Sequence, residues 1–139
     1  MTETRWPDGL PVRQVRIARP TQRLGQVVTF YRDTLGLTEL GRFTGHAGYD
    51  GVMLGLPGAD YHLEFTQHVD GRPGRAPTAD NLLVLYFDGP TEVAAVARRL
   101  GAAGHPAVPA ENPYWTEAGA VTVEDPDGWR VVLMPTPGF

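Results

Sequence analysis

The residues best suited to chemistry lie in one alternating stretch, Tyr61-His62-Leu63-Glu64-Phe65. Strand side chains point alternately to opposite faces, so His62 and Glu64 would share one face while the three large apolar side chains share the other. A carboxylate beside an imidazole can accept hydrogen bonds from a ligand, act as a general base or contribute to a metal site. Glu64 is therefore the candidate catalytic residue.

A similar pattern recurs near the C-terminal end of the chain. Asp125 to Leu133 is again a turn followed by a short run that begins with an aromatic residue and ends in aliphatic residues. An offset of 68 residues places Arg130 on His62. The same offset places Val132 on Glu64, so the second copy of the pattern has no carboxylate.

Each of these stretches is predicted to end a series of elements in the order strand, helix, strand, strand, strand. The helices are predicted from apolar residues at i, i+3, i+4 and i+7, and the strands from alternation between Gly-rich or Pro-rich turns. In the first half we expect a strand at 12–18, a helix from Thr21 to Leu35, and strands at 37–43, 51–56 and 61–66. In the second half we expect a strand at 82–87, a helix from Pro90 to about Leu100, a short strand at 107–108, a loop at 112–115, and strands at 118–123 and 129–134.

The composition is that of one ordinary globular domain, residues 1–139, with a first module at about 12–66, a connector at 67–80 and a second module at about 81–135. The net charge of −4 disfavours nucleic-acid binding, and no apolar run reaches the ~18 residues of a membrane span. We therefore expect a cytoplasmic protein. The chain has no Cys, Ser or Lys, which excludes disulfides, thiolate or serine nucleophiles and Schiff-base lysines.

The duplicated pattern resembles the vicinal oxygen chelate superfamily, the group of glyoxalases, bleomycin-resistance proteins and extradiol dioxygenases. The motifs that carry the resemblance are Phe30 to Gly36, His62 to Phe65 and Asp125 to Gly128, and the likeness runs from about Val12 to Pro135. It implies an α+β fold of two tandem βαβββ modules, whose mixed sheets curl into one cup with the helices outside. It also implies a ligand inside the cup and a homodimer.

The resemblance further implies a divalent metal in some members, held by one residue from the first and last strand of each module. Here Glu64 occupies one such position, but its counterpart Val132 has no donor atom. The first-strand positions fall on Gln14 or Arg16, and on Leu82 or Asn81. One good ligand out of four cannot hold a divalent ion tightly, and an arginine in the pocket would repel it. We therefore predict no metal and no cofactor.

Three interpretations of Glu64 stay open. The carboxylate could form a structural ion pair with Arg16 or Arg130, it could accept a ligand hydrogen bond or act as a base with a raised pKa, or it could retain a metal, with His62 in a rearranged site. For His62 the plain alternative is a hydrogen-bonded strand histidine.

The predicted function is metal-free binding of a small molecule, such as an aromatic or drug-like compound, within the cup. The alternatives are a lyase, isomerase or dioxygenase-like enzyme that uses Glu64, and a structural or regulatory dimer. Strand parity, together with an aromatic pair that could cap the mouth, selects the ligand-binding residues Gln14, Arg16, His62, Glu64, Tyr86, Tyr114, Trp115, Arg130 and Val132.

Overall fold

The computed structural model describes residues 6–56 and 58–138. Residues 1–5, Pro57 of the turn before the His62 stretch, and Phe139 lie outside this range. The elements of the first half are β1 (Val15–Pro20), α1 (Leu24–Val28), η1 (Thr29–Thr34), β2 (Thr38–His46), β3 (Tyr49–Gly55) and β4 (Tyr61–His68). Those of the second half are β5 (Leu82–Tyr86), α2 (Pro90–Ala102), α3 (Pro113–Glu117), β6 (Val121–Glu124) and β7 (Arg130–Met134).

The two halves repeat one strand topology. The first sheet has the order β1-β4-β3-β2, with β1 parallel to β4 and the remaining pairs antiparallel. The second sheet has the order β5-β7-β6, with β5 parallel to β7. An isolated bridge from Val108 to Thr122 stands where a short strand was predicted at 107–108. The first and last strands of each half are therefore neighbours, as the duplicated pattern requires.

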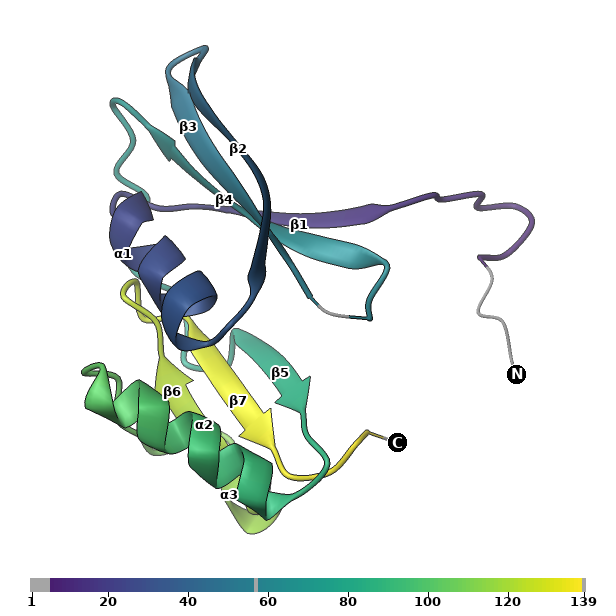
Figure 1. Cartoon of the computed structure of the whole chain (residues 1–139), viewed down its shortest axis with the longest axis vertical. Helices are drawn as coiled ribbons and strands as arrows, with labels where there is room; N and C mark the ends of the chain where they lie inside the picture. Colours follow the sequence, from purple (N-terminus) through teal and green to yellow (C-terminus); the bar gives the residue numbers. More distant parts are fainter. Residues whose placement is uncertain (1–5, 57, 139) are drawn as a thin grey trace.

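The α+β class expected from the sequence is confirmed, and the two sheets remain separate in the chain. Among the described residues no strand of the first sheet pairs with a strand of the second. Figure 1 shows α1 beside the first sheet and close to the end of the second, with the chain before β1 projecting away from the body. β1 and β5 each form an edge of their sheet.

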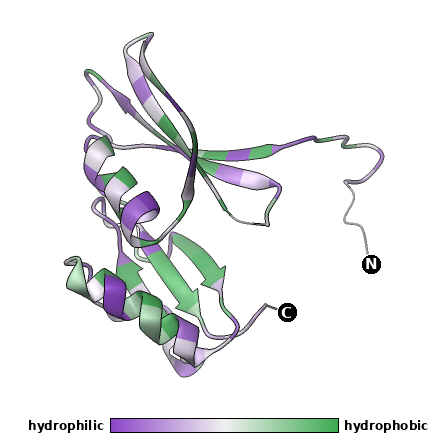
Figure 2. Cartoon of the chain, in the orientation of Figure 1, coloured by the Kyte–Doolittle hydropathy of each residue, from purple (hydrophilic) through white to green (hydrophobic). Residues whose placement is uncertain are grey.

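The core lies on the helix-facing sides of the two sheets. Its fully buried members are Val27, Phe30, Leu54, Leu100, Val123, Val131 and Leu133, which come from both halves. Figure 2 shows β5, β6 and β7 as largely hydrophobic, whereas the first sheet alternates along its strands. Because one apolar cluster joins the halves, they fold against each other rather than as independent units.

The first helix differs from the prediction in its start and in its pitch. It begins after Arg23, whose backbone N–H donates to the Thr21 hydroxyl over 3.1 Å, so Thr21 precedes the cap position. From Thr29 the helix widens to a π turn, in which the Leu35 N–H donates to the Phe30 carbonyl over 2.8 Å. Phe30 and Tyr31, in the first part of this wider turn, are both buried.

Residues 113–117 form the short helix α3, where a loop was predicted at 112–115. The Asn112 side chain accepts a hydrogen bond from the Tyr114 N–H over 3.0 Å, and Pro113 occupies the first helical position. Both residue types favour a helix start, and the prediction as a loop was wrong because Asn-Pro also marks turns. Several strand bounds also shift. β1 begins at Val15 rather than residue 12 and β6 at Val121 rather than residue 118, while β2 ends at His46 rather than residue 43.

Within the described part of the chain, no helix is both long and apolar enough to cross a membrane.

Candidate functional site

Arg16, His62 and Glu64 lie together on one face of the first sheet. The parallel register of β1 and β4 places Arg16 opposite His62, and Glu64 follows two residues further along β4. Arg16 Nε donates to His62 Nε2 over 2.9 Å, and Arg16 Nη1 donates to Glu64 Oε2 over 3.2 Å. The sequence left open whether Glu64 pairs with Arg16 or with Arg130. The structure contains the ion pair with Arg16.

The three side chains differ in exposure. His62 and Glu64 are buried, whereas the Arg16 side chain is 49% exposed. His62 Nε2 acts as an acceptor, so the proton of the neutral ring must lie on Nδ1. Both β4 side chains are thus fixed by one guanidinium that itself reaches solvent.

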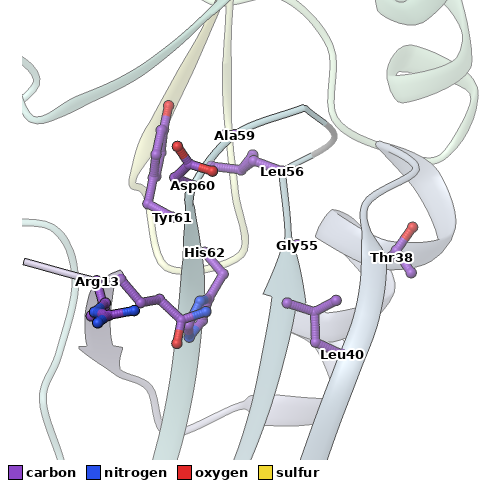
Figure 3. Close-up of a pocket in the computed structure, with 10 residues that line it drawn as sticks. Arg13, Thr38, Leu40, Gly55, Leu56, Ala59, Asp60, Tyr61 and His62 are labelled. Atoms are coloured by element: carbon purple, nitrogen blue, oxygen red, sulfur yellow. The ribbon is translucent and has the colours of Figure 1, made fainter. Parts of the chain in front are cut away.

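A cavity of about 680 Å³ opens beside this group, at the end of the sheet where β1 and β4 begin (Figure 3). Its apolar wall comes from β2, β3 and the turn before β4. Its polar groups come from the segment before β1 and from β4, with Thr38 of β2 and Asp60 of the turn. The lining residues are Arg13, Gln14, Thr38, Leu40, Gly55, Leu56, Ala59, Asp60, Tyr61 and His62. The volume and the mixture of apolar walls with a few polar groups are those of a small-molecule site.

The predicted ligand-binding residues separate into two groups in the chain. Gln14 and His62 line the cavity, and Arg16 and Glu64 adjoin it through the bonds to His62 and to each other. The remaining five belong to the second half and are not among the lining residues: Tyr86, Tyr114, Trp115, Arg130 and Val132.

Each residue of the second group has a defined environment. Tyr86 ends β5 and is 43% exposed, while Val132 is fully buried in β7. Tyr114 and Trp115 form an edge-to-face pair on α3, with ring centroids 5.0 Å apart. Arg130 Nε donates to Glu124, in the hairpin of the second sheet, over 3.3 Å.

The vicinal oxygen chelate fold can hold a metal, and the residues present here do not fit one. Of the family positions, Glu64 offers the one charged ligand, and both it and its neighbour His62 are already bonded to Arg16. In the second sheet, Leu82 and Val132, the counterpart of Glu64, offer no metal-binding atom. Nowhere in the described chain do three His, Asp or Glu side chains gather closely enough to hold an ion.

A second polar cluster, which sequence reasoning missed, joins the two halves. Arg19 at the end of β1 donates to Asp125 over 2.6 Å and to Asp127 over 2.9 Å, on the turn between β6 and β7. Arg23 also donates to Asp127, over 3.0 Å, and the Tyr31 hydroxyl donates to Asp125 over 2.7 Å. We call these five residues the inter-module cluster.

The Arg19 guanidinium of this cluster also stacks between two aromatic rings. It lies 4.9 Å from the Phe65 centroid and 5.1 Å from the Trp129 centroid. The signal available in the sequence was the acidic pair Asp125 and Asp127 on a turn. That turn supported the family resemblance, but its carboxylates were not paired with Arg19 or Arg23.

The inter-module cluster shifts the pKa values of its members. Burial raises the pKa of Asp125 although Arg19 and Tyr31 oppose it, and burial followed by the charge of Asp125 raises the pKa of Tyr31. Burial alone would also raise the pKa of Asp127. Hydrogen bonds from Thr21, Arg19 and Arg23 outweigh it and lower that pKa below its ordinary value of 3.8.

Comparison with solved structures defines the class of protein. Leishmania major glyoxalase I has a TM-score of 0.67 at 19% identity, with 89% of this chain and 86% of that chain covered. TnmS3, an antibiotic-binding protein from Streptomyces sp. CB03234, has a TM-score of 0.65 at 23% identity, with 93% and 99% covered. The fold is that of the glyoxalase and bleomycin-resistance class, the vicinal oxygen chelate superfamily.

Sequence comparison defines the family more narrowly. The YycE-like N-terminal domain matches residues 15–66, and the YycE-like C-terminal domain matches residues 80–135. YycE of Bacillus subtilis is 51% identical over 126 residues, which cover 91% of this chain and 90% of that protein. The crystal structure of a Bacillus subtilis YycE protein has a TM-score of 0.90 at 47% identity, with 98% of each chain covered. The chain belongs to the YycE-like family.

Proposed function

We propose that this protein binds a small organic molecule in the cavity beside Arg16, His62 and Glu64, without a metal ion. The observation that carries the proposal is the cavity itself, which combines an apolar wall with the buried polar side chain of His62. Cavities of this size and composition are the usual sites for small ligands. A protein that shares this fold, TnmS3, is an antibiotic-binding protein, which is consistent with a binding role.

We further propose that the functional unit is a homodimer in which β1 of one copy pairs with β5 of the other. Both strands are sheet edges, and the unpaired backbone groups of an edge strand are a template for pairing with another chain. Ile17 on β1 is 52% exposed, and the apolar β5 is only half-buried before it ends at the exposed Tyr86.

Such pairing would complete the cup that the resemblance implies. The face that carries Arg16 in one copy would become continuous with the face that carries Val132 in the other, because the two halves share one topology. The aromatic pair of α3 belongs to that second half. The ligand-binding residues that are separate within one chain would then converge across two chains.

The binding role can be tested by a thermal-shift screen of planar aromatic compounds with wild type and a His62→Phe variant, which removes the buried polar side chain of the cavity. A compound at 100 times its dissociation constant stabilises the folded state by about 2.7 kcal/mol, so binding should raise the melting temperature of wild type but not of the variant. Equal shifts in both proteins would place the compound elsewhere and contradict the proposal.

Recovery of the compound separates binding from catalysis. The proposed function predicts that mass spectrometry finds the compound unchanged after prolonged incubation. Chemical conversion that disappears in Glu64→Gln would instead support the enzyme alternative, in which the Glu64 carboxylate acts as a base.

A further inference from the structure

One cation of the chain itself already lies between His62 and Glu64. We infer that Arg16 is a built-in substitute for a metal ion at this site, and that its free guanidinium nitrogen binds an anionic oxygen of the ligand. The inference deepens the proposed function and rests on it, because it names the chemical class of the molecule that the cavity takes: a small organic anion with an apolar body.

The first step is that Arg16 uses the lone pairs that a metal would need. A metal binds a histidine through an unprotonated ring nitrogen and a glutamate through a carboxylate oxygen. Here the unprotonated His62 Nε2 accepts from Arg16 Nε at 2.9 Å, and Glu64 Oε2 accepts from Arg16 Nη1 at 3.2 Å. A guanidinium does not lose its proton in a protein, so the positive charge at this point is permanent.

The second step is that Arg16 still has capacity for a ligand. Its Nη2 has no hydrogen-bond partner among the described residues, and half of its side chain is exposed. Because β4 holds the other two nitrogens, the guanidinium plane is fixed before a ligand arrives, which lowers the entropy cost of binding. A planar donor of this kind suits a carboxylate or another oxyanion.

The third step is the position of this donor relative to the cavity. His62 lines the cavity and accepts a hydrogen bond from Arg16 Nε over 2.9 Å, so the guanidinium lies directly behind a lining side chain. Within the lining itself, Arg13 contributes one positive charge and Asp60 one carboxylate. A carboxylate at Arg16 would leave an aromatic or aliphatic body to lie against the wall that contains Leu40 and Leu56.

The substitution for a metal can be tested with Ni²⁺ alone, by isothermal titration of tag-free protein. The variant Arg16→His removes the internal cation and adds an imidazole opposite His62, so we expect it to bind Ni²⁺ at least 10-fold more tightly than wild type. Arg16→His combined with Glu64→Gln should lose most of that gain, which assigns the ion to this site. Wild-type binding of Ni²⁺ that is as tight as in Arg16→His, and that Glu64→Gln abolishes, would overturn the inference.

The ligand class can be tested with 2-naphthoate and its neutral isostere 2-naphthamide. We expect wild type to bind the naphthoate at least 10-fold more tightly, and Arg16→Gln to remove this preference while it still binds the amide. Arg42→Gln is the matched control, because Arg42 forms an exposed ion pair with Glu39 and is not a lining residue of the cavity. Thermal melts check that each variant is folded.

Two outcomes would contradict the inference in different ways. If wild type binds both compounds equally in the cavity, Arg16 is not an anion anchor, yet the proposed binding function stands. If neither these compounds nor any other planar compound binds, the proposed function falls together with the inference.

Discussion

The Tyr31 hydroxyl donates to Asp125 Oδ2 over 2.7 Å, a hydrogen bond that joins the helical segment of the first half to the last hairpin of the second. Both side chains are buried, and 94 residues of sequence separate them. Arg19 donates to the same Asp125 oxygen from β1. The relation between the two halves is therefore fixed by charged and polar groups as well as by the common apolar core.

Replacing Tyr31 by phenylalanine tests this hydrogen bond with little change in volume. We expect Tyr31→Phe to lower the free energy of unfolding by about 1–2 kcal/mol, because a bond to a charged group is lost while Asp125 keeps its other partners. Urea titration measures the change. Tyr61→Phe is the control: Tyr61 is 42% exposed, so its loss should stay within about 0.5 kcal/mol.

Asp127 gives the inter-module cluster a dependence on pH. Its pKa is lowered in the folded state, so the unfolded chain binds more protons between the folded value and the unfolded value of ~3.9. The stability that ionised Asp127 contributes is complete above the unfolded value and is lost as the pH falls through the folded one. Asp125 has the opposite sign, because its pKa is raised.

The variant Asp127→Asn isolates this contribution. At pH 7 we expect it to cost about 3 kcal/mol, the low end of the range for breaking a buried ion pair, because Arg23 is 36% exposed and can turn to solvent. At pH 3 the difference between variant and wild type should be smaller. Denaturant titrations of both proteins at the two pH values measure it, and a difference that grows towards acid would contradict the assignment.

The order of elements and the faces of the strands could be predicted from the sequence, because they depend on local periodicity. The alternation in β4 placed His62 and Glu64 on one face, and the register of β1 brings Arg16 to both. The Arg16 pair with Glu64 was one of two ion pairs considered; Arg130 instead donates to Glu124 and to the Pro109 carbonyl.

The rest could not be predicted because it depends on contacts between distant segments. Arg19 meets Asp125 and Asp127 across more than one hundred residues of sequence, and no local pattern records that approach. In the π turn, Phe30 packs against His105 of the second half and Tyr31 packs against Phe65 of the first, and helical periodicity does not record such contacts. Strand parity predicted which side chains share a face of their strand. It could not show that the two inner faces lie on separate sheets.

A charged residue on β1 tests the proposed dimer. Ile17→Glu would place a carboxylate at the exposed apolar edge, so we expect the protein to change from twice the mass of one chain to a single chain in light scattering. Val69→Glu is the matched control, because Val69 is 72% exposed at the β4 end of the first sheet and lies on neither β1 nor β5. A wild type that is a monomer at all concentrations would contradict the dimer.

Trp115 provides the last test, because it connects the dimer with the ligand. It lies on α3 in the second half and is not a lining residue of the cavity in its own chain, so the proposed dimer is what would bring it to a cavity. Replacing Trp115 by alanine should weaken 2-naphthoate binding by about 1–3 kcal/mol, the range of a moderate aromatic contact. No residue of α3 is buried, so the melting temperature should change little.

Trp6→Ala is the matched control for Trp115→Ala, since Trp6 is 46% exposed on the segment before β1. Quenching of tryptophan fluorescence by the naphthoate should persist in the Trp6 variant and fall in the Trp115 variant. The effect of Trp115→Ala should also vanish in an Ile17→Glu background, because a single chain does not bring α3 to the cavity. Equal losses from both tryptophan variants, or a Trp115 effect that survives in the monomer, would show that Trp115 does not cover the site.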